Sequence, residues 1–207
     1  MHKTLFIYMA GTIKKGHDND KELDWSENDL AFLRQHLNVE EVVFLNPADR
    51  LDNLGLQKSV FGRDLFQVYS SQLVLVDGRG KRGLGVGAEM MFAKMNRVPV
   101  VAWVPNETYY HRKDVHILGQ FVEDYMHPFI YNLCDYIAQD LSDASQWINN
   151  ELLANKAAIK GPEYLHETVS HYLEDQLDKD TTMKHWIDTH PRLKAKAESF
   201  ACLDCCH

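Results

Sequence analysis

Short apolar runs alternate with amphipathic stretches through the first hundred residues. The runs occupy residues 3–9, 41–45, 72–77 and 98–104, and glycine or proline follows each of them within two positions. Strands buried on both faces of a parallel sheet have this composition. The alternation predicts strands joined by right-handed helical crossovers, and therefore a doubly wound, Rossmann-like or flavodoxin-like α/β sheet.

Helical spacing fills the segments between these runs. Ser26 and Asp29 have the spacing of a capping box, and leucines then recur at positions 30, 33 and 37. A second helix is expected to end near Ser71, and a third to cover residues 88–95.

The pattern changes near residue 105, where β-branched runs disappear and charged and aromatic residues become more frequent. Helical spacing continues over residues 129–141, 143–156, 162–178 and 181–198. We therefore expect an α/β domain over residues 1–105 and a helical extension over 106–207, packed on that domain or on an oligomer partner.

Composition and charge argue against membranes and nucleic acids as partners of this protein. The chain of 207 residues has no apolar run of membrane-spanning length and begins without a signal-peptide pattern, so we expect a cytoplasmic protein that does not enter a membrane. A formal net charge of -8 argues against nucleic-acid binding but allows a small anionic ligand in a locally basic cleft.

The C-terminal sequence CLDCCH offers soft metal ligands in Cys202, Cys205, Cys206 and His207. Structural zinc sites usually draw two ligand pairs from separated segments, and this cluster lacks the second pair. We expect a reducible tail, with no metal and no cofactor in the protein.

Two glycine patterns overlap after the third apolar run. Gly78, Gly80 and Gly83 spell G-x-G-x-x-G, whereas Gly83, Gly85 and Gly87 lead directly to Glu89. A dinucleotide fingerprint belongs after the first strand and needs an acid at the end of the next one, but here the next run ends without an acid. The second pattern is favoured, with glycines that serve only a tight crossover as the alternative.

A crevice is expected where the first and third strands end. In a doubly wound sheet these strands are neighbours whose following loops diverge, so both loops border one pocket. Each loop is basic, which favours an anionic ligand such as a nucleoside monophosphate, although charged loops are often only solvated. The basic residues are Lys14, Lys15, Arg79, Lys81 and Arg82.

The motifs IYMAGTI at 7–13 and LGVGAE at 84–89, with Asp64 between them, resemble the nucleoside 2-deoxyribosyltransferase superfamily, including its deoxynucleoside 5'-monophosphate N-glycosidase branch. The resemblance covers residues 4 to about 104 and implies that Glu89 is the nucleophile. It also assigns the strand tyrosine to Tyr8 and the upstream aspartate to Asp64. This chain departs from the glycosidase branch with Lys14 in place of an arginine and Gly83 in place of a serine.

The resemblance also implies a homo-oligomer, a dimer or larger, in which a segment after the fourth strand completes the neighbouring pocket. The segment at 127–141, with polar His127 and Asn132 among helically spaced apolar residues, is the candidate. An ordinary helix start with solvated polar groups is the alternative.

Glu89 suits the chemistry of an N-glycosidic bond. A carboxylate beneath the anomeric carbon can stabilise or trap the oxocarbenium-like sugar, and a helix N-terminus is expected to lower its pKa. A glutamate that merely complements the helix dipole is the alternative. The second carboxylate is either Asp64 or Asp77, unless Asp77 only caps its loop. Tyr8 either holds Glu89 by a hydrogen bond or is a core aromatic.

These residues together predict cleavage of an N-glycosidic bond in a nucleoside or nucleoside 5'-monophosphate, with hydrolysis favoured over transfer. The alternatives are a base-exchanging deoxyribosyltransferase and a catalytically silent nucleotide-sensing module. The expected substrate contacts are Gly11, Thr12, Ile13, Lys14, Gly83, Gly85, Gly87 and Arg82.

Overall fold

The computed structural model describes residues 2–11 and 25–203. The chain divides into two compact units, Met1–Gly161 and Pro162–His207. Residues 106–161 therefore belong with the α/β sheet rather than with the predicted helical extension. The last strand of the sheet lies in this region, which is why the boundary falls later in the chain than residue 105.

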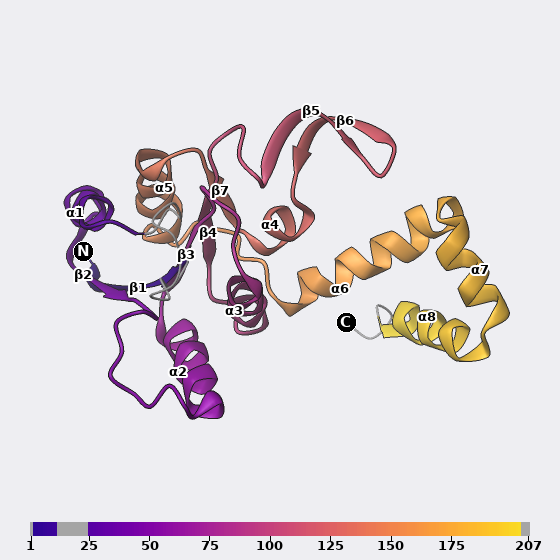
Figure 1. Cartoon of the computed structure of the whole chain (residues 1–207), viewed down its shortest axis with the longest axis horizontal. Helices are drawn as coiled ribbons and strands as arrows, with labels where there is room; N and C mark the ends of the chain where they lie inside the picture. The colour runs from indigo at the N-terminus through magenta and orange to yellow at the C-terminus, as the bar shows by residue number, and fades with distance from the viewer. Residues whose placement is uncertain (1, 12–24, 204–207) are drawn as a thin grey trace. The chain divides into compact units, whose positions relative to one another are not determined.

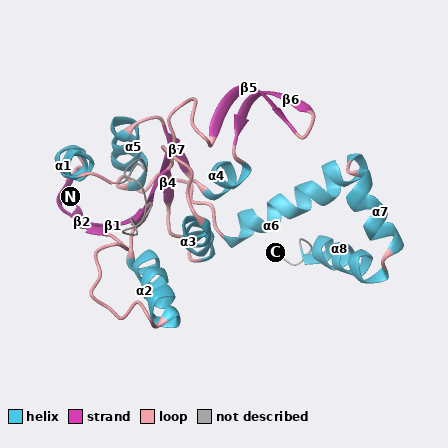
Figure 2. Cartoon of the chain, in the orientation of Figure 1, coloured by secondary structure: helices cyan, strands magenta, loops and turns pink. Residues whose placement is uncertain are grey.

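A five-stranded parallel sheet forms the centre of the first unit (Figures 1 and 2), in the order β2-β1-β3-β4-β7. The first four strands are those that the apolar runs predicted, and their order confirms the doubly wound fold. At the centre, Tyr8 of β1 lies opposite Leu45 of β2 and Val74 of β3. The strands are β1 (His2–Ala10), β2 (Val39–Leu45), β3 (Leu73–Asp77), β4 (Val100–Trp103) and β7 (Tyr136–Ala138).

Helices cover both faces of this sheet (Figure 1). On one face α1 (Glu27–His36) contacts α5 (Leu141–Trp147), and on the other α3 (Leu84–Met95) contacts α2 (Gln57–Ser70) and α4 (Pro128–Leu133). The core beneath α1 and α5 is apolar, with residues such as Ile7, Leu33 and Leu75 fully buried.

The N-terminus of α1 is capped as the sequence predicted. The Ser26 hydroxyl accepts a hydrogen bond from the Asp29 amide at 3.2 Å, and the Asp29 carboxylate accepts one from the Ser26 amide at 2.9 Å. This reciprocal pair is the predicted capping box. At α3 the helix begins at Leu84, one turn earlier than the predicted range of 88–95.

An antiparallel hairpin of β5 (His111–Ile117) and β6 (Gln120–Met126) interrupts the region that was predicted to be helical. Its turn has positive φ at Leu118 (50°) and Gly119 (82°), as hairpin turns require. Most of its side chains are exposed or half-buried, so neither strand shows the apolar alternation by which a sequence reveals a half-buried strand.

The predicted helix at 129–141 is also wrong beyond Leu133, because the chain enters β7 and pairs with β4. Asp135 precedes this strand, and its carboxylate accepts hydrogen bonds from the amides of Val100 (2.6 Å) and Lys160 (2.7 Å). The same carboxylate pairs with the buried ammonium of Lys94 on α3. These interactions fix the end of α4 and the start of β7.

The remaining segments are helical, as predicted, but they are divided. After α5 a π-helical turn, η1, covers Ile148–Leu152. The second unit contains α6 (Pro162–His171), a π-helical turn η2 (Tyr172–Gln176), a short 3-10 turn η3 (Leu177–Lys179), α7 (Thr181–Thr189) and α8 (Pro191–Leu203). Pro191 separates α7 from α8, since proline disfavours helix at the residue before it. No helix among the described residues has both the length and the apolar character to cross a membrane.

Candidate functional site

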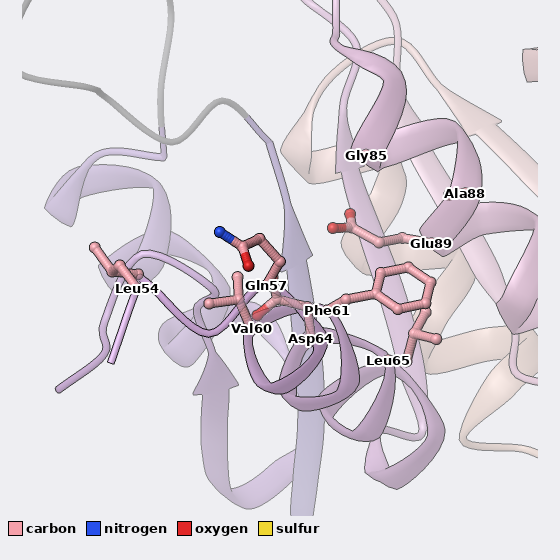
Figure 3. Close-up of a pocket in the computed structure, with 9 residues that line it drawn as sticks. All are labelled: Leu54, Gln57, Val60, Phe61, Asp64, Leu65, Gly85, Ala88 and Glu89. Carbon is pink, nitrogen blue, oxygen red and sulfur yellow. The ribbon is translucent and has the colours of Figure 1, made fainter. Parts of the chain in front are cut away.

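A cavity of about 250 Å³ lies between α2 and α3 and contains two of the predicted carboxylates. Figure 3 shows Glu89 reaching into it from α3, with Asp64 and Gln57 contributed by α2. The rest of the wall is apolar except for the backbone at Gly85. The apolar residues are Leu54, Val60, Phe61, Leu65 and Ala88.

Burial controls the ionisation of Glu89. Because α3 begins at Leu84, this residue lies in the second helical turn and not at the helix N-terminus. Desolvation raises the pKa of Glu89 to about 7, with a smaller rise from the charge of Asp64, while a hydrogen bond from Tyr8 opposes the rise. The expectation of a dipole-lowered pKa is therefore wrong, because the loss of solvent outweighs a dipole that weakens beyond the first turn.

Tyr8, on β1, is a polar neighbour of Glu89. Its side chain is fully buried on β1, and burial followed by the charge of Glu89 raises the pKa of its hydroxyl. Among the described residues, neither its hydroxyl nor Glu89 Oε2 has a well-aligned hydrogen-bond partner. The two groups nevertheless lie close enough to influence each other's pKa.

Two arginines hold Asp64 in place. Arg50 Nη1 donates to both oxygens of Asp64 at 3.2 and 3.3 Å, and Arg63 Nη1 donates to Oδ1 at 3.5 Å. Arg50 also binds Asp52 through two hydrogen bonds of 2.6 Å. Asp64 thus presents a rigid, ion-paired carboxylate to the cavity. The sequence analysis did not single out Arg50, which lies in an irregular loop without a motif.

Asp77 belongs to a different cluster and lines neither this cavity nor the second one described below. It is fully buried at the end of β3, with Arg79 Nη2 at 2.9 Å and Arg82 Nη2 at 2.7 Å from its Oδ2. Arg82 Nε also donates to the Asp77 carbonyl. The alternative of a loop-capping Asp77 matches this arrangement. The Arg82 side chain is only 2% exposed and pairs with Asp77, and Arg82 also lines the second cavity described below.

Side chains occupy the edge of the sheet where the crevice was expected. The Arg79 guanidinium lies 4.0 Å from the centre of the Trp103 ring and 5.8 Å from that of Trp25. Trp25 Nε1 donates to the Ala10 carbonyl at 3.3 Å, and a Cβ on Gly11 would stand 3.2 Å from the same nitrogen. Gly11 therefore permits the indole to pack here. Thr12, Ile13, Lys14 and Lys15 lie outside the described residues.

The first glycine of the G-x-G-x-x-G pattern has a packing role. A Cβ on Gly78 would lie 2.6 Å from Val104 Cγ2 and 2.9 Å from the Trp103 carbonyl oxygen, closer than atoms can approach. The alternative of glycines that serve a tight crossover is thus favoured at this position.

A second cavity, of about 400 Å³, lies on the other flank of α3. Gly83 and Gly87 line it together with Lys81, whereas Gly85 lines the first cavity. His127 is also in its wall, and Asn132 donates to the Pro128 carbonyl at 2.9 Å within α4. His127 thus faces a cavity of its own subunit, while Asn132 has the local contact expected of an ordinary helix start.

Within the described part of the chain, no group of three or more His, Cys, Asp or Glu side chains could hold a metal ion. The predicted cysteine cluster falls outside that part except for the backbone of Cys202.

Comparisons with known proteins leave the chemistry open. No family model matches the chain, and no curated protein is similar to it. Among solved structures, the chain is similar to a conserved protein from Enterococcus faecalis V583, with 15% identity and a TM-score of 0.48 over 69% of this chain and 96% of that one.

Proposed function

We propose that the chain cleaves N-glycosidic bonds of nucleosides or nucleotides, with Glu89 as the nucleophile. The observation that carries the proposal is the convergence of Glu89 and Asp64, from two different helices, on one cavity of about 250 Å³. The resemblance to the nucleoside 2-deoxyribosyltransferase superfamily assigns roles to the same two residues and to Tyr8.

In this mechanism Glu89 attacks the anomeric carbon and displaces the base, which leaves with the electron pair of the C–N bond. Water then attacks the glycosyl ester and regenerates the carboxylate. Asp64, held by Arg50 at 3.2 Å, is placed to accept a hydrogen bond from a sugar hydroxyl. The Tyr8 hydroxyl keeps its proton, because its pKa is raised, and can hold Glu89 in the attacking rotamer.

Hydrolysis is favoured over transfer to a second base. The outer wall of the cavity is open to solvent, since Leu54 is 66% and Phe61 58% exposed. A transferase must instead keep water out while the acceptor base binds.

The predicted homo-oligomer is also part of this proposal. Phe66 (67% exposed) and Tyr69 (61% exposed) extend the exposed apolar surface of α2, which a second subunit could cover. Light scattering of the purified protein would test it.

The test is to incubate the protein with deoxyribonucleosides, ribonucleosides and their 5'-monophosphates, and to follow free base by chromatography. Glu89→Gln preserves size but removes the nucleophile, so turnover should fall at least about a hundredfold. Glu40→Gln, at an exposed position of β2, removes the same charge and should leave turnover unchanged. Wild-type protein that releases no base, or a Glu89→Gln variant as active as Glu40→Gln, would refute the proposal.

A further inference from the structure

The second cavity adjoins the first, because Ala88 lines both of them. It lies between α3, α4 and the segment that precedes β5. Aromatic side chains from Tyr109, Tyr110, His127 and Phe129 form part of its wall, and Leu84 and Met91 of α3 form another part. A wall of this composition suits a flat aromatic group.

Only a low ridge of α3 separates the two cavities. Ala88 lines both of them, Gly85 lines the first and Gly87 the second. All three residues are exposed, and a Cβ on Gly87 would meet no atom within 4 Å. At Gly85, Gly87 and Ala88 no side chain is larger than a methyl group. One ligand can therefore cross the ridge at these positions.

The first cavity alone is small for a complete substrate. Its volume of about 250 Å³ lies below that of most ligand pockets, which begin at about 300 Å³. The second cavity, of about 400 Å³, is the larger of the two although it contains neither candidate carboxylate. A substrate that uses both would place its reacting bond at Glu89 and a second group beyond the ridge.

The aromatic wall is organised around His127. Its ring centre lies 5.4 Å from that of Tyr110, edge to face, and 6.0 Å from that of Phe129. Burial lowers the pKa of His127, so the imidazole is neutral at physiological pH and acts as one more flat ring. This cluster offers stacking surfaces and a hydrogen-bonding ring nitrogen, which are the features that bind a nucleic-acid base.

Cations border the aromatic wall. Lys81 Nζ lies 5.3 Å from the centre of the Tyr109 ring, and the Arg112 guanidinium lies 5.8 Å from the same ring. Lys81 is exposed and itself lines the cavity. A negatively charged group next to the stacked ring would therefore be stabilised.

We propose that the two cavities together bind a substrate of two nucleosides joined through phosphate, with the scissile glycosidic bond over Glu89 and the distal base against Tyr109 and Phe129. This inference rests on the proposed function and specifies its substrate class. The phosphate linkage crosses the ridge near Lys81. One water is consumed: the C–N bond breaks, the proximal base leaves with its electron pair, and the hydroxyl of water remains on the sugar. The proton of that water passes to the departing base or, when the base is cationic in the substrate, to solvent. The distal base is not cleaved and serves only for binding.

The experiment compares one-base and two-base substrates. Nicotinamide adenine dinucleotide represents a pyrophosphate linkage, deoxyadenylyl-deoxyadenosine a phosphodiester linkage, and AMP and dAMP the one-base substrates. The wild-type protein should have a higher kcat/KM for at least one two-base probe than for either monophosphate, and the better probe identifies the linkage.

Tyr109→Ala and Phe129→Ala remove stacking surface at exposed positions. Each should lower the ratio of two-base to one-base kcat/KM by about tenfold, as expected when a base loses an aromatic partner. Phe121→Ala removes an aromatic ring that is 59% exposed on β6, outside both cavities, and should leave the ratio at its wild-type value. Thermal melts would establish that all three variants are folded.

A ratio that is the same in Tyr109→Ala and Phe121→Ala, or a wild-type preference for the monophosphates, would overturn the inference and leave the proposed function standing. If neither these probes nor the wider panel of nucleosides and monophosphates release base, the proposed function fails. Calorimetric binding to the Glu89→Gln variant then decides the inference separately. Tighter binding of a two-base probe than of AMP and dAMP, weakened by Tyr109→Ala, would support the two-cavity site. Equal affinities would refute it.

Discussion

Glu89→Gln should stabilise the protein, and the gain should depend on pH. Burial raises the pKa of Glu89 from 4.5 to about 7, so the folded state binds this proton more tightly than the unfolded chain does. The stability that this group contributes is therefore present below pH 4.5 and is lost as the pH rises from there through about 7. Glutamine mimics the protonated form and does not titrate, so the variant avoids the loss.

The magnitude follows from the size of the shift. One pKa unit corresponds to about 1.4 kcal/mol, so the ionised Glu89 costs the folded state about 3 kcal/mol well above pH 7. For a chain of this size, 1 kcal/mol changes Tm by about 2–4 °C. The variant should melt about 6–12 °C higher than the wild type at high pH, and at nearly the same temperature at low pH.

The assay is thermal unfolding followed by tryptophan fluorescence, at pH values well below and well above the two pKa values. Glu40→Gln is the matched control, because it removes one negative charge from an exposed site on β2. The reasoning is refuted if Glu89→Gln gives the same change in Tm at both pH values, or if it destabilises the protein at high pH.

Four further results are expected. The kcat/KM for base release should rise with pH through about 7 and then level, because the nucleophile must be ionised; a fall over the same range would instead identify Glu89 as a general acid. Asp77→Ala should lower the unfolding free energy by about 3–5 kcal/mol in urea titrations, since it removes the buried carboxylate that Arg79 and Arg82 share, and a loss below about 1 kcal/mol would contradict that account. Gly78→Ala should cost about 1–3 kcal/mol by the same measurement because its Cβ would collide with Val104, whereas Gly80→Ala meets no atom within 4 Å and should not show that loss. A labelled free base supplied with an unlabelled nucleotide should stay unincorporated if water is the acceptor, and label in new nucleotide at a rate comparable to base release would make the protein a transferase.

The first four strands could be predicted because each contains a short apolar run. The run is buried throughout in β3 and almost throughout in β4, whereas β2, at the edge of the sheet, is half-buried to exposed. β7 could not be recognised in this way. It has only three residues, Tyr136–Ala138, and it follows α4 directly, so its apolar side chains continued the helical spacing. The Asp135 carboxylate, with the buried Lys94 and the Lys160 amide as partners, stops the helix there. Those partners are 41 and 25 residues away along the chain, beyond the reach of local periodicity.

The roles of the two candidate carboxylates also depend on partners that the local sequence pattern does not reveal. Asp77 was a candidate for the second acid because it ends the third strand, and Asp64 because of the family resemblance. Their partners distinguish them: Asp77 is enclosed by Arg79 and Arg82 from its own loop, whereas Asp64 is held by Arg50 yet still lines the cavity. The basic loop after β3 had suggested an anion site, but two of its three cations are ion-paired with Asp77.

The ionisation of Glu89 depends on contacts that no motif encodes. The LGVGAE sequence places a glutamate in α3, but its pKa is set mainly by the removal of water on folding, when α2 and the sheet pack around that helix. The same packing brings Asp64 close enough for its charge to raise this pKa further, and Tyr8 close enough to oppose the rise. An ionised, buried carboxylate with a pKa near 7 is costly to the fold. In the proposed reaction the oxocarbenium-like sugar would supply its counter-charge. The stability that Glu89→Gln should recover and the turnover that it should lose therefore have one cause, and a variant that changed only one of them would separate burial from catalysis.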